Sequence, residues 1–170
     1  MKIFSAEQIK RWDARTIEEE KIASVDLMER AARQCVQWLT LHYPITKTER
    51  HFRIFCGKGN NGGDGLAIAR MLLKEKCRVQ VILCDSNTRE SDDFRINLTR
   101  LQHLKGDIIK ITEGDALPVF NEDDIIIDAL LGTGVNKPLE GLLGNTVQHI
   151  NRNGCEVISI DIPSGMFCDR

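Results

Sequence analysis

A glycine-rich segment in the first half of the chain constrains the fold most. Residues 57–65 are Gly-Lys-Gly-Asn-Asn-Gly-Gly-Asp-Gly, with an apolar run before them and a helix-forming stretch after them. A strand that enters such a turn and leaves it as a helix presents backbone N–H groups to phosphate in α/β proteins. The segment therefore predicts an α/β fold, an anionic ligand and the place where that ligand binds.

The size and charge of the chain limit its class and its partners. Its 170 residues, 42% of them hydrophobic and 28% charged, suit one globular domain with one core over residues 1–170. A net charge of −2 without a long basic run argues against nucleic acid as a partner. No apolar stretch is long enough to span a membrane, and the N-terminus turns polar too early for a signal peptide. The six cysteines are scattered without a C-x-x-C pair, so we expect a reduced, cytoplasmic protein.

Apolar runs alternate with helical patterns through most of the chain. The pattern predicts strands at 52–56, 78–84, 108–111, 124–128 and 156–161, and helices at 65–74, 89–104 and 139–151. Two further helices, at 5–20 and from residue 24 onward, precede the first strand. Strands that are apolar along their length and alternate with helices indicate a mainly parallel sheet covered on both faces.

Polar residues follow three of these predicted strands. The carboxyl ends of parallel strands share one edge of the sheet, and ligands bind there at the topological switch point. The residues that we expect at this edge are Asn60, Asn61, Asp64, Asp128, Asp161 and Ser164. Carboxylate, amide and hydroxyl oxygens suit a Group 1 or Group 2 cation, and a further carboxylate can act as a general acid or base. Each aspartate could instead be a helix cap or a strand end, but three such clusters at one edge favour a functional site.

The same segment also satisfies a dinucleotide fingerprint. Residues 57–62 fit G-x-G-x-x-G, and Asp85 ends the next predicted strand where a ribose-binding acid would stand. This interpretation predicts an NAD-dependent dehydrogenase. The pattern is loose, however, and Asp64 places a carboxylate where a pyrophosphate would approach the helix. A phosphate-binding P-loop is excluded because no Gly-Lys-Ser or Gly-Lys-Thr follows at the required spacing.

Three motifs occur in order along the chain: the glycine-rich segment 57–65, the segment 128–134 with sequence Asp-Ala-Leu-Leu-Gly-Thr-Gly, and the segment 161–165 with sequence Asp-Ile-Pro-Ser-Gly. Together they resemble the YjeF N-terminal domain family, the NAD(P)H-hydrate epimerases. Residues 5–32 resemble the family as well, so the resemblance covers nearly the whole chain in order. It implies a Rossmann-like, three-layer αβα fold preceded by two N-terminal helices.

The resemblance also implies an activity and a set of residues for it. The activity is the interconversion of the R and S epimers of NADHX and NADPHX, cofactors hydrated at C6 of the nicotinamide ring. A potassium ion would be held by Asn61, Asp128 and Ser164. The substrate would contact Asn60, Asn61, Gly62, Gly63, Asp64, Gly132, Thr133, Gly134, Val135, Asn136, Lys137, Pro138 and Asp161.

A mechanism follows as a hypothesis, with Asp161 as the catalytic acid and base. Donation from the ring nitrogen expels the C6 hydroxyl, and water returns to either face of the planar centre. The family domain usually continues beyond the last motif, so we expect a domain truncated at its C-terminal end. The resemblance also implies a bifunctional protein that includes an NAD(P)H-hydrate dehydratase, or a separate dehydratase that works beside this chain. The two leading helices could form a homodimer surface.

Two other functions remain open at this point. A dehydrogenase would change the absorbance of the reduced nicotinamide, whereas an epimerase would change the R/S ratio without net redox. A non-catalytic nucleotide-binding or protein-interaction module would do neither.

Overall fold

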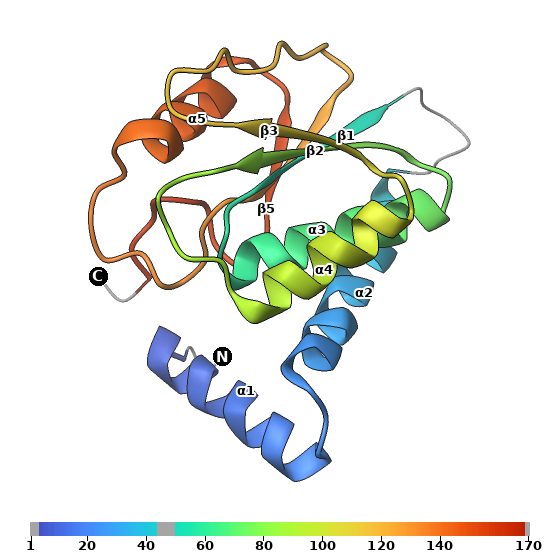
Figure 1. Ribbon diagram of the computed structural model, residues 1–170, viewed down its shortest axis with the longest axis vertical. Coiled ribbons are helices and arrows are strands. Elements are labelled where there is room, and N and C mark those ends of the chain that lie inside the picture. The colour runs from blue at the N-terminus through green and yellow to red at the C-terminus, as the bar shows by residue number, and fades with distance from the viewer. Residues whose placement is uncertain (1–3, 44–49, 169–170) are drawn as a thin grey trace.

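Five parallel strands form the centre of the computed structural model, which describes residues 4–43 and 50–168 (Figure 1). The strands are β1 (His51–Cys56), β2 (Arg78–Cys84), β3 (Asp107–Ile111), β4 (Ile125–Ala129) and β5 (Glu156–Ser159). Their order in the sheet is β3-β2-β1-β4-β5, and each neighbouring pair is parallel. The mainly parallel sheet predicted from the apolar strands is confirmed.

Helices cover both faces of this sheet. They are α1 (Ala6–Glu20), α2 (Ser24–His42), α3 (Asn60–Lys74), α4 (Asp92–His103) and α5 (Gly141–Arg152). Figure 1 shows α2, α3 and α4 on one side of the strands and α5 on the other. Two separate apolar clusters fill the spaces between the layers, one around Leu66 and Leu101 and one around Leu142 and Ile150. The predicted three-layer αβα fold, preceded by two helices, is confirmed.

The strand order reverses direction between β1 and β4. From β1 the chain builds β2 and β3 on one side of the sheet, and β4 and β5 then add to the other side. Neighbouring strands at such a reversal diverge at their carboxyl ends, which leaves room for a ligand. The register places Phe55 opposite Asp128 and Cys56 opposite Ala129. Asp128 therefore stands at the switch point, beside the start of the glycine-rich segment.

The glycine-rich segment is more helical than the sequence predicts. We expected a turn up to Asp64 and a helix from Gly65, but α3 begins at Asn60. Glycine is a poor helix former, so propensity alone favours a loop. Here the glycines allow close packing: a Cβ on Gly62 would lie 1.8 Å from the Gly57 carbonyl oxygen, and one on Gly65 would lie 2.6 Å from the Ala129 Cβ.

Other element boundaries also differ from the prediction; α5, for example, begins at Gly141 instead of residue 139. α4 begins at Asp92 instead of residue 89, because the Ser91 side chain accepts the Phe94 N–H at 3.2 Å and caps the helix. β5 ends at Ser159, two residues before the predicted end of that strand. Asp161 consequently lies in the loop that follows β5.

Helix α1 stands apart from the sheet. Its start is fixed by Ser5, whose hydroxyl accepts the Gln8 N–H at 3.2 Å in a capping box. None of its residues is buried, and Figure 1 shows it below the rest of the molecule, apart from the strands and joined to α2 by a short connection. None of the helices in residues 4–43 and 50–168 is long and apolar enough to cross a membrane.

Candidate functional site

Three segments that are distant in sequence meet at the switch point. A Cβ on Gly132, in the loop after β4, would lie 2.5 Å from Asp161 Oδ2 and 3.5 Å from the Asn61 Cβ. The backbone N–H of Thr133 donates to Asp161 Oδ2 at 2.9 Å. The start of α3, the loop after β4 and the loop after β5 therefore converge on Gly132, where the absence of a side chain leaves space between Asn61 and Asp161.

A hydrogen-bonded pair, Asp128 and Ser164, ties the ends of β4 and β5 together. Both residues are buried. Ser164 Oγ donates to Asp128 Oδ1 at 2.6 Å, and the Ser164 backbone N–H donates to Oδ2 at 2.9 Å. The Ser164 hydroxyl in turn accepts the Leu131 N–H at 2.9 Å. This arrangement ties the loop after β4 to the loop after β5.

Asn61 has buried polar atoms without partners. Its side chain is 7% exposed, and neither amide atom has a hydrogen-bond partner among the described residues. A buried amide without a hydrogen bond costs about 1–3 kcal/mol, so such an atom in a folded protein points to a ligand. Asn61 stands near the start of α3, beside the loop after β4, and its amide oxygen and the oxygens of Asp128 and Ser164 are all hard donors. Such a set fits a hard Group 1 or Group 2 cation.

The described residues contain no cluster of side chains suited to a softer metal such as zinc. In the part of the chain that the structure describes, no group of three or more His, Cys, Asp or Glu side chains is placed to hold a metal ion.

Asp64 has an unusual environment. It is the fifth residue of α3 and not its N-cap, which is Gly59. Burial first, and then the charges of Asp161, Asp93 and Asp13, raise the pKa of the Asp64 carboxyl from 3.8 to about 7. A carboxyl with a pKa near neutrality is suited to donate or accept a proton at physiological pH.

Asp161 is held in a strained backbone conformation. Its φ is +66°, in the left-handed region that residues with a side chain seldom adopt. Such strain persists where the surroundings fix it, often at functional sites. Here the bond from Thr133 holds the exposed carboxylate toward Gly132. Sequence reasoning missed this conformation, because an aspartate, although it adopts positive φ more readily than most residues, does not require it.

The N-terminus of α3 is open to an anion. Its cap residue Gly59 is exposed, makes no side-chain cap, and has no atom within 4 Å of where a Cβ would stand. The N–H groups of the first helical turn lack intrahelical acceptors and carry the positive end of the helix dipole. Asn60, the first helical residue, is also exposed. The phosphate-binding role predicted for this segment thus has an accessible helix N-terminus to support it.

Asp85 does not have the environment of a ribose-binding acid. Its Oδ1 accepts the Lys58 ammonium at 2.7 Å and its Oδ2 accepts the Lys110 ammonium at 2.7 Å. These two lysines lower the pKa of the Asp85 carboxyl. A carboxylate paired on both oxygens is poorly placed to accept two ribose hydroxyls. The pairing of Asp85 with two lysines therefore argues against the dehydrogenase interpretation, which needed this carboxylate to bind the ribose.

The loop residues 134–138 lie farther along toward α5. Val135 is half-buried, whereas Gly134, Asn136, Lys137 and Pro138 are exposed. Within the described residues, no hydrogen bond or ion pair joins their side chains to Asn61, Asp128 or Asp161. The structure thus brings Asn61, Gly132, Thr133 and Asp161 together and leaves 134–138 as the outer wall of the loop.

Asp13 reaches the neighbourhood of the site without any sequence signal. Burial and the charge of Asp161 raise the pKa of the Asp13 carboxyl, and Asp13 contributes to the raised pKa of Asp64. It is a polar residue in a polar helix, so only the position of α1 shows its proximity. Cys56, in contrast, is fully buried at the end of β1, and burial raises the pKa of its thiol well above 9.0, which excludes it as a nucleophile at neutral pH.

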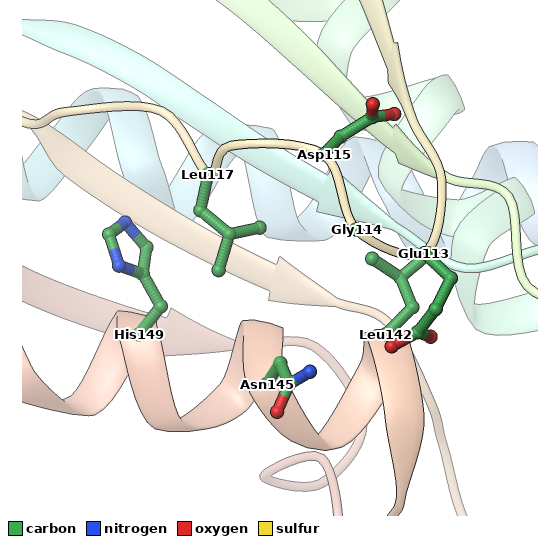
Figure 2. A pocket seen from close by; sticks show the side chains of 7 residues that line it. All are labelled: Glu113, Gly114, Asp115, Leu117, Leu142, Asn145 and His149. Carbon is green, nitrogen blue, oxygen red and sulfur yellow. The ribbon is translucent and has the colours of Figure 1, made fainter.

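A cavity of about 430 Å³ lies on the α5 side of the sheet, between α5 and the loop after β3. Figure 2 shows Asn145 and His149 of α5 on one side of it and Asp115 and Leu117 of the loop on the other. The His149 ring nitrogen Nε2 hydrogen-bonds the Pro118 carbonyl at 2.8 Å. None of the residues predicted from the sequence to form the site lines this cavity.

Comparison with known proteins identifies relatives over nearly the whole chain. The family described as YjeF-related protein N-terminus matches residues 24–170. The chain is 35% identical over 173 residues to a protein of Anaerococcus prevotii named NAD(P)H-hydrate epimerase, with 99% of this chain and 77% of that protein covered. It is also 35% identical to the Rhodobacter capsulatus protein of the same name, with 92% and 76% covered.

Longer relatives and one solved structure match as well. A Moorella thermoacetica protein named bifunctional NAD(P)H-hydrate repair enzyme Nnr is 32% identical, and the match covers 99% of this chain. The chain spans about a third of that relative, 33% of its length. The crystal structure of the yeast protein ynu0 matches with a TM-score of 0.83 and 23% identity, covering 97% of this chain and 72% of the yeast chain. This likeness shows a shared fold.

Proposed function

The chain belongs to the YjeF-related N-terminal family, and from this premise we infer that it is an NAD(P)H-hydrate epimerase. The observation that carries this conclusion is 35% identity over 99% of the chain to a curated epimerase. As an isomerase, it interconverts the R and S epimers of hydrated nicotinamide cofactors, NADHX and NADPHX, and so serves cofactor repair.

The substrate lies across the switch point. The N–H groups at the start of α3, from Asn60 to Asp64, face its phosphates, as the open Gly59 cap allows. Gly132, Thr133 and the outer loop 134–138 line the path toward the nicotinamide ring. Asp161, held by the Thr133 N–H at 2.9 Å, faces the reacting carbon.

A potassium ion is the cation that this proposal assigns to the site. Asn61, Asp128 and Ser164 would hold it, and the unpaired buried amide of Asn61 supports that assignment. When bound, the ion supplies positive charge that moderates the repulsion among the nearby carboxylates. The chain's own contribution is to hold the loops after β4 and β5 together through the Asp128–Ser164 pair.

The mechanism that we propose needs no redox step. The lone pair of the ring nitrogen forms a C=N bond with C6 while the C6–O bond breaks, and a proton from a carboxyl group converts the departing hydroxyl to water. Water then adds to either face of the planar iminium centre and gives its proton to a carboxylate. Asp161 is the acid–base residue of this cycle, since its carboxylate is exposed and fixed beside Gly132.

Replacement of Asp161 tests the assignment. Purified R epimer is incubated with the wild-type chain or with Asp161→Asn, and the R/S ratio is followed by chromatography. We expect the variant to lose at least about 100-fold in rate, the usual contribution of a general acid or base. The matched control is Asp92→Asn, which removes an exposed carboxylate that pairs with Arg95 on α4. A wild-type rate in Asp161→Asn would refute the assignment.

The potassium assignment has its own test. Thermal melting is measured in potassium chloride and in choline chloride at equal ionic strength. A bound ion raises the melting temperature in proportion to the logarithm of its concentration. We expect such a rise for the wild-type chain and none for Asn61→Leu, which removes the unpaired amide. Equal melting in both salts would contradict the proposal.

We propose a cytoplasmic location and two kinds of protein partner. Cys56, Cys77 and Cys84 are buried and unbridged, as in a reducing compartment. The bifunctional relatives support the idea that an NAD(P)H-hydrate dehydratase is fused to this domain or works beside it. A homodimer through α1 is the second proposal, because a 15-residue helix with no buried residue is marginal in water without a partner.

A further inference from the structure

Epimerisation at C6 requires proton transfer on two faces of the ring. If the hydroxyl leaves from one face as water, the new hydroxyl must form from water on the opposite face. One carboxyl group fixed to one loop stands on a single side of a bound ring. Inversion is therefore served best by two acid–base groups, one of which carries a proton while the other does not.

The structure offers a second carboxyl group beside the first. Asp64 belongs to α3 and follows Asn61 by three residues, so the two share one face of the helix. A Cβ on Gly132 would lie 3.5 Å from the Asn61 Cβ and 2.5 Å from Asp161 Oδ2. Asp64 lies one helical turn beyond Asn61 on α3, whereas Asp161 belongs to the loop after β5, and the charge of Asp161 reaches the Asp64 carboxyl group.

The two carboxyl groups differ in how they are held. Asp161 Oδ2 already accepts the Thr133 N–H, which keeps it oriented as an acceptor. Asp64 makes no hydrogen bond or ion pair within the described residues, although it is half-buried. A carboxyl group partly withdrawn from water and without a partner favours its neutral form, which can donate a proton.

Given the epimerase function proposed above, we propose that Asp64 is a second catalytic residue, which serves the face of the nicotinamide ring opposite Asp161. In one direction the Asp64 carboxyl gives its proton to the departing hydroxyl, the C6–O bond breaks and water is released. Water then adds to the other face, and its proton passes to the Asp161 carboxylate. In the reverse direction the two residues exchange roles, so atoms and charges balance without any oxidant or reductant.

The charges around Asp64 support its role as the proton donor beside Asp161. The charged groups that face Asp64 are all acidic: Asp161 after β5, Asp93 on α4 and Asp13 on α1. The thiols of Cys35 on α2 and Cys56 on β1 also feel its charge. Together with burial, the three carboxylates raise the pKa of Asp64 to about 7, so that both of its protonation states are populated near neutral pH.

The test distinguishes exchange of the C6 oxygen with water from inversion of the configuration at C6. Each pure epimer is incubated in oxygen-18-labelled water with the wild-type chain, Asp64→Asn or Asp161→Asn, and both the label at C6 and the R/S ratio are measured. The wild-type chain should invert and label both epimers. Asp64→Asn should lose inversion by at least about 100-fold yet still label, with retention, the one epimer whose hydroxyl faces Asp161. Asp161→Asn should label the other epimer.

This mirrored preference is a signature that simple structural damage would not produce. Circular dichroism and the binding of unhydrated NADPH confirm that each variant is folded, and Asp92→Asn serves as the matched control. Inversion by Asp64→Asn at a rate within threefold of wild type overturns the proposal, and so does loss of labelling of both epimers in a folded, binding-competent variant. Failure of the wild-type chain to invert either epimer counts instead against the epimerase function.

Discussion

At the scale of single residues, the site depends on one missing side chain. Gly132 separates Asn61 from Asp161, and its neighbour Thr133 provides the N–H that orients Asp161. The backbone of the loop after β4 therefore orients the Asp161 carboxylate, a task that a polar side chain performs in many active sites. Because Asp161 also has a left-handed backbone, its position depends on this loop more than on its own conformational preference.

Gly132→Ala should therefore abolish activity with little effect on stability. The added Cβ would lie 2.5 Å from Asp161 Oδ2 and would displace that carboxylate. A displacement of about 1 Å can cost about 100-fold in rate, and we expect a loss of that size in the R/S assay. Gly134→Ala is the control in the same loop, since nothing lies within 4 Å of its added Cβ. Equal activity in the two variants would contradict this view of the loop.

Asp64 should make the stability of the folded chain depend on pH. Its carboxyl titrates near pH 7 in the folded chain and near 3.8 when exposed, so between these values the folded state binds more protons. Stability is fully present below pH 3.8 and declines as pH rises through 7. Asp64→Asn removes this decline and should be more stable than wild type by about 2 kcal/mol at pH 8, after allowance for partial exposure.

Urea denaturation at pH 8 and at pH 4.5 measures this effect. The difference between Asp64→Asn and wild type should shrink toward zero at the lower pH, where the wild-type carboxyl is protonated in the folded chain. A difference of the same size at both pH values would show that the carboxyl group is not strained by its surroundings.

At the scale of elements, most of the fold could be predicted because its signals are local. The apolar strands, the Ser5 capping box and the alternation of strand and helix all depend on residues close in sequence. The start of α3 could not be predicted in the same way. The five glycines of residues 57–65 disfavour a helix locally, and only their contacts with Gly57, Met28 and Ala129 explain why Asn60 begins one.

Some features of the candidate site could be predicted from the sequence, and others depend on tertiary contacts. Parallel strands bring their carboxyl ends to one edge, so the meeting of Asn61, Asp128 and Ser164 near that edge follows from topology. The raised pKa of Asp64 and the approach of Asp13 depend on burial and on where α1 lies. No spacing in the sequence encodes either of them.

Substitution at two of these glycines separates packing from propensity. Gly62→Ala places a Cβ 1.8 Å from the Gly57 carbonyl oxygen, and backbone cannot yield as a side chain can. We expect a loss of about 3 kcal/mol or more in the free energy of unfolding. Gly59→Ala meets no atom within 4 Å and should cost about 1 kcal/mol or less, the range for a changed N-cap. Similar costs in urea denaturation would show that helix propensity, not packing, selects glycine here.

At the scale of the whole molecule, α1 connects two properties of the chain. Its Asp13 approaches the site, while Ile9 and Trp12 are exposed, Trp12 by 57%. A helix without buried residues needs another surface to be stable, and a second copy of the chain provides one in our proposal.

The apolar side of α1 should control the oligomeric state. Sedimentation velocity is expected to show a dimer for the wild-type chain and a monomer for Trp12→Glu, because a buried charge at such an interface is costly. Lys10→Glu, an exposed position on the same helix outside the groove that Trp12 lines, is the control for a charge change alone and should remain dimeric. A monomeric wild-type chain would refute the dimer without affecting the site.

The most direct measurement of the central claim is the approach to equilibrium from both sides. Pure R epimer and pure S epimer of NADPHX are incubated separately with the wild-type chain in potassium buffer, and the R/S ratio is followed by chromatography. The epimerase assignment predicts that both solutions reach one common ratio far faster than without protein, with no nicotinamide oxidation. Ratios that change only at the spontaneous rate would contradict it.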